Sequence, residues 1–350
     1  MRTHLHLSAT LLAILAAAST MDLSARSEGG PVNGTIWVAN RGANTVRAID
    51  ADTLEPVWTI PMAANSQPGD LAVAKHKVYV AEELGTPPAI AIIDAGTGLL
   101  LSRIVLPAGS RPHHVHASQG GNFVAVGLYG TDTVAVVDTH TDALVGIWDS
   151  DPGSTNGRVH AAVFSNDEHT LYLASDTTGQ IIAMDPLSGT VWWRLSVPAA
   201  HEMAVTNNQR LLVVSRRTDD RLAVIRLDPD TTVAPAGYQD VLSLPRPDTL
   251  RFSANEALLT VGLRAVPGPA KLAVVDTRTG HVDLVTLGPP GETTTVGGHQ
   301  WTSPDGRYTL ASYEGGSSPG VAIIDHKAGN RVIGTISYPG RPHGVEHTRP

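Results

Sequence analysis

Histidines recur at one position of a repeated segment, and they are the residues most able to do chemistry. The densest copy, 111–118, carries three histidines within four residues at the start of a predicted β-strand. Seven such segments align on a closing small residue, which is serine or threonine in six of them. Five positions earlier, five copies carry histidine or aspartate, and a sixth has histidine one place later. In chain order these residues are His113, His160, His201, Asp248, His299 and His343.

This pattern predicts a metal site. Imidazole is the commonest neutral metal ligand near pH 7, and the sequence has no cysteine, so thiolate ligands are excluded. With nitrogen and oxygen ligands alone, Zn²⁺, Cu²⁺, Fe²⁺ and Mn²⁺ all remain candidates. Glu202 and His114 lie next to the repeated position and are candidate catalytic groups for proton transfer, while Asp70 could support them. We expect a divalent transition metal to be held by ligands from one set: His113, His160, His201, His343, His299 and Asp248.

Other residues near this position have more than one open interpretation. Trp301 could form the wall of a pocket, and His116 and His347 are expected to be buried histidines of the strands. The histidines could also line a water-filled polar channel, or hold an organic or haem-type cofactor. Four arginines could bind an anionic ligand or cofactor at a rim, or could form salt bridges there: Arg111, Arg158, Arg246 and Arg341.

A longer repeated unit would position these residues. Each of seven copies has an apolar alternating run, a polar turn and a second run that ends in aspartate in six copies, as in 36–40 with 46–50. A period of about 40–50 residues is typical of propeller blades. We therefore predict an all-β, seven-bladed β-propeller of four-stranded antiparallel blades. Inner strands surround the axial channel of a propeller, so their first residues would form one ring.

The two ends of the repeat predict how the propeller closes. The first unit begins at Gly34 without an inner strand before it, whereas 343–348 is an inner strand with no unit after it. The C-terminal strand is therefore expected to join the first blade, which removes open sheet edges. Residues 34–350 would then form a single β-propeller domain.

Residues 1–25 have the layout of a secretory signal peptide. Arg2 precedes a short apolar run, 11–18, and small residues follow as far as Ala25. The run is too short to span a bilayer, and no cysteine is present for lipid attachment. We expect 1–25 to be a signal peptide and 26–33 a linker, with the mature protein secreted or periplasmic and without a transmembrane segment.

Composition argues against several classes of function. The net charge is −8 and no run of Lys or Arg occurs, which disfavours a nucleic-acid partner. The sequence has no Gly-x-Ser-x-Gly, phosphate-binding loop or dinucleotide fingerprint, so a serine-type hydrolase is not expected. We expect a monomer that binds a small-molecule ligand or a protein partner at the propeller rim.

Two segments carry a resemblance to a known repeat. Segment 36–50, which includes Ile-Trp-Val-Ala-Asn and Asn-Thr-Val-Arg-Ala-Ile-Asp, resembles the YVTN-type β-propeller repeat, as does 303–308. Proteins with this repeat include lactonase-like propellers, haem d1 domains of nitrite reductases and a streptogramin-opening lyase, so the resemblance implies the fold and leaves the function open. Three hypotheses remain. The chain is a metal-binding protein or metalloenzyme with hydrolytic, lyase or redox chemistry; a scaffold for a protein or cell-envelope partner; or a metal-independent lactonase-like enzyme.

Overall fold

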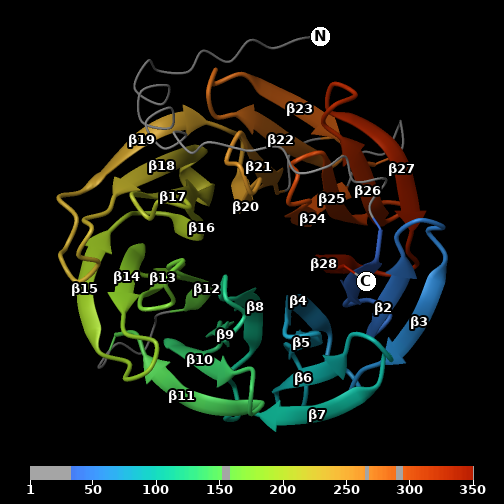
Figure 1. The fold of residues 1–350 in the computed structure, drawn as a ribbon, viewed down its shortest axis with the longest axis horizontal. Coiled ribbons are helices and arrows are strands. Elements are labelled where there is room, and N and C mark those ends of the chain that lie inside the picture. Colours follow the sequence, from blue (N-terminus) through green and yellow to red (C-terminus); the bar gives the residue numbers. More distant parts are fainter. Residues whose placement is uncertain (1–32, 152–157, 265–267, 289–294, 350) are drawn as a thin grey trace.

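A computed structural model describes residues 33–151, 158–264, 268–288 and 295–349. In this part of the chain, seven four-stranded sheets stand as blades around one axis, as the ring of arrows in Figure 1 shows. The one helical element described is a short 3-10 turn, η1 (Arg217–Asp219), and no described helix is long and apolar enough to cross a membrane. The predicted seven-bladed propeller is therefore confirmed. The expected signal peptide, 1–25, and all of the expected linker 26–33 except Asn33 lie outside the described residues.

The blades are numbered in chain order, with the strands of each given from the channel outward. Blade 1 contains β28 (Pro342–Thr348), β1 (Thr35–Asn40), β2 (Thr45–Asp50) and β3 (Pro56–Pro61). Blade 2 contains β4 (Pro68–Ala74), β5 (Lys77–Glu82), β6 (Ala89–Asp94) and β7 (Leu100–Val105). Blade 3 contains β8 (Pro112–Ala117), β9 (Phe123–Leu128), β10 (Thr133–Asp138) and β11 (Ala143–Asp149). Blade 4 contains β12 (Val159–Phe164), β13 (Leu171–Ser175), β14 (Gln180–Met184) and β15 (Val191–Ser196). Blade 5 contains β16 (Ala200–Val205), β17 (Leu211–Arg216), β18 (Arg221–Arg226) and β19 (Tyr238–Ser243). Blade 6 contains β20 (Pro247–Phe252), β21 (Leu258–Leu263), β22 (Lys271–Asp276) and β23 (Val282–Thr286). Blade 7 contains β24 (Thr295–Thr302), β25 (Tyr308–Gly315), β26 (Gly320–Asp325) and β27 (Arg331–Ser337).

The core lies between the blades, because each blade packs both its faces against neighbours. In blade 3, the apolar side chains alternate between the two interfaces, as the period of a strand requires. Val124 and Val126 on β9 pack toward blade 2, whereas Val134 and Val136 on β10 pack toward blade 4. All four are fully buried, which explains why the two middle strands of a blade read as almost continuous apolar runs.

The C-terminal strand closes the ring, as predicted. β28 pairs antiparallel with β1, with Val345 opposite Val38 and Thr348 opposite Thr35. The indole Nε1 of Trp37 also donates a hydrogen bond to Oγ1 of Thr348 at 3.1 Å. In Figure 1 the red β28 accordingly lies on the channel side of the blue strands of blade 1.

A β-bulge interrupts every inner strand where the predicted ring residues lie. The pairing of β8 with β9 shifts register between Pro112 and Val115, so His113 and His114 form the bulge. Corresponding shifts occur in β4, β12, β16, β20 and β24, and in the pairing of β28 with β1. A bulge sets two residues opposite one and redirects their side chains. Consecutive residues of an inner strand can therefore both face the channel.

Candidate functional site

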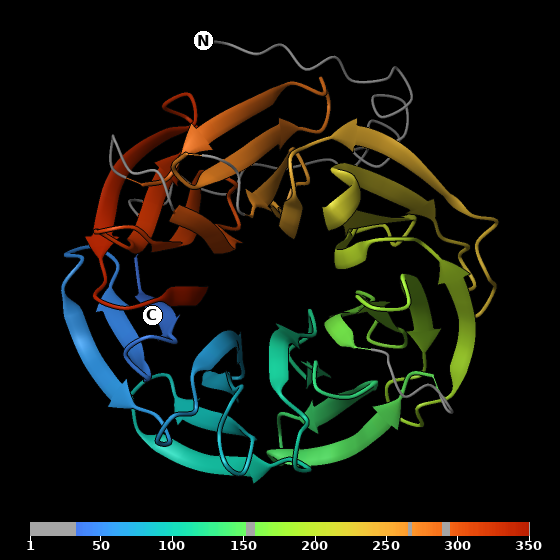
Figure 2. The same cartoon turned by 180° about the vertical axis from the view of Figure 1, so that it is seen from behind.

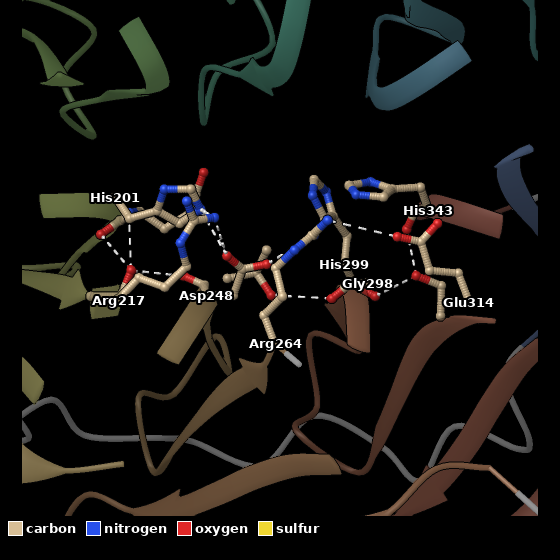
Figure 3. Close-up of polar contacts among 12 residues, drawn as sticks. His201, Arg217, Asp248, Arg264, Gly298, His299, Glu314 and His343 are labelled. Atoms are coloured by element: carbon tan, nitrogen blue, oxygen red, sulfur yellow. Dashed lines mark hydrogen bonds and ion pairs between the residues drawn. The ribbon is translucent and has the colours of Figure 1, made fainter. Parts of the chain in front are cut away.

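Six histidines converge where the inner strands begin. The ring centroids of His114 and His160 are 4.3 Å apart, those of His114 and His299 are 4.4 Å apart, and those of His299 and His343 are also 4.4 Å apart. Figure 3 shows three members of the group, His201, His299 and His343, in the space between the inner strands. Figure 2 shows the ring of blades from the side opposite to Figure 1. Repeat spacing has thus brought together residues from five blades: His343, His113 with His114, His160, His201 and His299.

Two overlapping groups in this cluster could each hold a metal ion. The first is His113, His114 and His160, and the second is Asp70, His114 and His299; in each group the potential ligand atoms all lie within 4.8 Å of one another. Ligand atoms around a tetrahedral ion with bonds of about 2.0–2.1 Å stand about 3.3 Å apart. The side chains would have to draw together slightly around an ion, and His114 is common to both groups.

Burial keeps several of these imidazoles neutral. It lowers the pKa of His113 to about 4 and is the largest cause of the pKa values of His160 and His343 falling well below the usual range. Neighbouring positive charge acts in the same direction, from His201 on His160 and from Arg41 on His343. Neither ring nitrogen of His343 has a hydrogen-bond partner among the described residues. A neutral imidazole offers a lone pair, so these rings are suited to metal binding.

Glu202 on β16 contacts His114 on β8. Its Oε1 lies 3.0 Å from Nδ1 of His114 and 3.8 Å from Nδ1 of His160. Burial disfavours the cation of His114, but Glu202, and after it Asp70, outweigh burial and raise the pKa of His114. Burial likewise opposes ionisation of Glu202, yet His114 lowers the pKa of that carboxyl overall. This histidine–carboxylate pair can hold or transfer a proton beside the neutral imidazoles.

His201 and Asp248, both predicted metal ligands, are engaged in an ion-pair network. Nε2 of His201 lies 2.7 Å from Oδ1 of Asp248, and its Nδ1 lies 3.2 Å from Oδ1 of Asp176. Arg217 approaches Oδ1 of Asp248 at 3.1 Å and Arg264 approaches its Oδ2 at 3.4 Å, as Figure 3 shows. Both residues lie at the channel as expected, but existing partners compete with any metal for their ligand atoms.

Sequence reasoning missed a second set of residues around the histidines, which we call the outer ring. Arg41 and Glu83 form a salt bridge of 2.9 Å, and Nδ1 of His113 lies 3.4 Å from the same Arg41 guanidinium. The common place of the outer ring in the repeat could have revealed it, but its mixed chemistry produces no obvious pattern. Its members lie at or directly after the end of the second strand of each blade: Arg41, Glu83, Tyr129, Asp176, Arg217, Arg264 and Glu314.

The four arginines predicted at the rim have different surroundings. Arg111 and Arg341 form salt bridges of 2.8 Å and 3.0 Å with the glutamates of the outer ring. The guanidinium carbon atoms of Arg111 and Arg158 lie 5.6 Å and 5.2 Å from the ring centroid of Tyr129. Arg246 is exposed directly before β20. Salt bridging therefore accounts for two of the four residues.

Trp301 packs away from the histidine cluster. Its ring centroid is 4.6 Å from that of His347, and it contacts the core between blades 7 and 1. His347 lies in β28 as expected but is half-buried there, and burial lowers its pKa to about 4.

A cavity of about 260 Å³ opens on one side of the cluster. Beyond the cluster, its wall is formed by residues further along the inner strands, among them His116, Arg251, Phe252 and Glu346. The cavity gives a small molecule access to one side of the cluster. The cluster residues in its wall are Asp70, His114, Glu202 and His299.

Comparisons with known proteins agree with this architecture. The periplasmic gluconolactonase PpgL of Pseudomonas aeruginosa has a TM-score of 0.68 and 17% identity, with 91% of this chain and 99% of that chain covered. The dihydro-haem d1 dehydrogenase NirN has a TM-score of 0.63 and 18% identity, with 94% and 78% covered. Hydrazine synthase of Kuenenia stuttgartiensis has a TM-score of 0.58 and 15% identity, with 74% and 77% covered. These likenesses show a shared fold.

Sequence comparison assigns the family. No curated protein sequence matches the chain. The family model described as "Lactonase, 7-bladed beta-propeller" matches residues 107–296, which is more than half of the 350 residues. The chain therefore belongs to the seven-bladed β-propeller lactonase family.

Proposed function

We propose that this protein binds a divalent transition metal through His113, His114 and His160 and hydrolyses a lactone or related ester at that site. The observation that carries the proposal is the approach of three imidazoles whose ligand atoms lie within 4.8 Å of one another. Burial supports it by keeping His113 and His160 neutral. Membership of the lactonase family supports the choice of substrate class. Zn²⁺, Cu²⁺, Fe²⁺ and Mn²⁺ are the candidate ions.

The residues around the three imidazoles would orient the site and move protons. An ion bound there would polarise a carbonyl group or make water more acidic. Glu202, at 3.0 Å from Nδ1 of His114, would fix the orientation of that ring and accept a proton from water. At the rim, Arg158 is exposed and could position an anionic ligand.

The pairing of His114 with Glu202 also favours a second candidate function, metal-independent lactone hydrolysis. In that reaction Glu202 would take a proton from water as the water oxygen bonds to the carbonyl carbon. His114 would then donate a proton to the ring oxygen as the carbonyl carbon–oxygen bond of the ring breaks. The 3.0 Å contact places the acid and the base side by side.

Elemental analysis tests the metal proposal. The chain is purified without a histidine tag or chelating resin, as wild type and as the double variant His113→Ala/His160→Ala. The matched control is His140→Ala/His281→Ala, which removes two exposed histidines from turns. We expect one ion per wild-type or control chain, and loss of bound copper or zinc from the His113→Ala/His160→Ala variant. Substoichiometric metal whose amount is unchanged in the His113→Ala/His160→Ala variant would refute metal binding by these histidines.

Turnover of a panel of lactones, followed by acid release, separates the two functions. Activity that is lost on chelation and restored by metal supports the metal-dependent reaction. Activity that survives exhaustive metal removal but falls by about 100-fold or more in Glu202→Gln supports the metal-independent reaction. A chain that binds metal and turns over none of the panel would contradict the hydrolytic part of the proposal and favour a binding protein.

We further propose that the protein is exported to the periplasm or secreted, and that it is a monomer. The layout of 1–25 supports export. N-terminal sequencing of protein recovered outside the cytoplasm tests cleavage near residue 25, and light scattering tests the monomer. Retention of an uncleaved chain in the cytoplasm would contradict export.

A further inference from the structure

Two buried carboxylates of the channel lack an arginine partner. Glu83, Asp248 and Glu314 each form an ion pair with at least one arginine. Among the described residues, the ion contacts of Asp70 and Glu202 are to histidines alone. Buried charges are normally paired or coordinate metals. The local charge around these two carboxylates therefore suits a cation.

Asp70 lies between two imidazoles from different blades. Its Oδ1 is 2.9 Å from Nδ1 of His299, and its Oδ2 is 3.6 Å from Nδ1 of His114. The two rings are stacked, with centroids 4.4 Å apart and an interplanar angle of 15°. The backbone N–H of Val115 donates to Oδ2 of Asp70 at 3.0 Å and fixes the orientation of the carboxylate. Two nitrogens and one carboxylate are thus held in a defined arrangement.

Glu202 adds a second buried carboxylate beside this group. Among the described residues, its Oε1 is approached only by imidazole nitrogens, Nδ1 of His114 at 3.0 Å and Nδ1 of His160 at 3.8 Å. The residue is 7% exposed, so bulk water does little to solvate its charge. Buried charges are normally paired or coordinate metals, so a cation beside His114 would also be stabilised by Glu202.

The cavity distinguishes the two overlapping groups. Asp70, His114 and His299 all line it, whereas His113 and His160 do not. An ion held by Asp70 and its two histidines would therefore keep coordination positions open toward the cavity.

We propose that Asp70, His114 and His299 form a second cation site, with Glu202 beside it, which takes a harder divalent ion such as Mn²⁺ or Fe²⁺. A carboxylate suits these ions, whereas the three-imidazole group suits Cu²⁺ or Zn²⁺. A neutral imidazole coordinates through one nitrogen, so the shared His114 makes the two sites alternatives. This inference rests on the metal binding proposed above, and it assigns a preferred ion to each of the two groups.

Titration of the metal-free, untagged full-length chain with Cu²⁺ and with Mn²⁺ tests this selectivity. We expect Asp70→Asn to weaken Mn²⁺ binding by about tenfold or more and to leave Cu²⁺ affinity within about twofold of wild type. His160→Ala should weaken Cu²⁺ binding by about tenfold or more and leave Mn²⁺ affinity within about twofold of wild type. His114→Ala should weaken both. The matched control is Glu314→Gln, which changes another buried channel carboxylate outside both groups, and it should change neither affinity.

Stoichiometry and water relaxation sharpen the test. We expect one ion per chain in mixed titrations, and enhanced water-proton relaxation from bound Mn²⁺ because open positions face the cavity. Equal Mn²⁺ affinity in wild type and Asp70→Asn, two ions per chain, or no relaxation enhancement would each overturn the inference. If Asp70→Asn fails to fold, His299→Ala gives the same comparison. Absence of all metal binding in the wild type would instead refute the proposed metal function as well.

Discussion

Asp70 on β4 and His299 on β24 are 229 positions apart in the sequence, and their side chains meet at 2.9 Å in the channel. β4 belongs to blade 2 and β24 to blade 7, so only blade 1 lies between them. Blade 1 is the blade that the C-terminal strand completes. The contact therefore depends on closure of the ring, which links the stability of the propeller to the geometry of its candidate site.

Deleting 342–350 is expected to abolish cooperative folding. The deletion removes β28, which leaves β1 as an open edge and takes the hydrogen-bond acceptor Thr348 from Nε1 of Trp37. Thermal unfolding followed by circular dichroism measures the effect, with deletion of 349–350 as the control. A cooperative transition at the wild-type temperature in the longer deletion would show that closure by β28 is dispensable.

Asp248→Asn is expected to destabilise the protein by about 3 kcal/mol. Asp248 is buried and contacts the half-buried guanidinium groups of Arg217 and Arg264 and the buried ring of His201, so the substitution removes a buried negative charge from the centre of an ion-pair network. Denaturant unfolding gives the difference in free energy, and Glu55→Gln on an exposed turn should stay within about 0.5 kcal/mol of wild type. Equal stability of the two variants would mean that the ion-pair network contributes little.

Glu346 should give stability a pH dependence whose sign is set by burial. Burial raises the pKa of Glu346 from 4.5 to about 6, although Arg251 acts in the opposite direction. The folded state therefore holds this proton more tightly than the unfolded chain. The contribution of protonated Glu346 to the free energy of unfolding is fully present below about pH 4.5. About 2 kcal/mol of that free energy is lost as pH rises through about 6.

The variant Glu346→Gln isolates this effect because glutamine does not ionise. The free energy of unfolding of wild type minus that of the variant should fall between pH 4 and pH 7. A difference that stays constant, or rises, over this range would contradict a raised pKa for Glu346.

Repeat spacing predicted the meeting of His113, His160 and His343 because a closed ring turns one repeat position into one location in space. It could not predict how His201 is paired. Asp176, its partner, follows the second strand of the neighbouring blade, and that contact depends on side-chain packing between blades. Asp70 was expected only in a supporting role because Gly69 occupies the aligned position in its copy. The inner-strand bulge lets the next residue face the channel as well, and bulges leave no clear periodic signal.

Gly127→Ala tests how packing between blades positions His160. A Cβ atom at Gly127 would lie 2.8 Å from the backbone oxygen of His160 and 2.9 Å from that of Val159, so β12 would have to move away from β9. Overpacking of this kind costs about 1–3 kcal/mol. Because His160 belongs to the three-imidazole group alone, Cu²⁺ affinity should fall while Mn²⁺ affinity is largely kept. Denaturant unfolding and metal titration measure the two effects, with Gly96→Ala as the control, where the nearest atom is 3.5 Å away. An equal loss of affinity for Cu²⁺ and Mn²⁺ would show that movement of β12 disturbs the whole cluster rather than one of two separable groups.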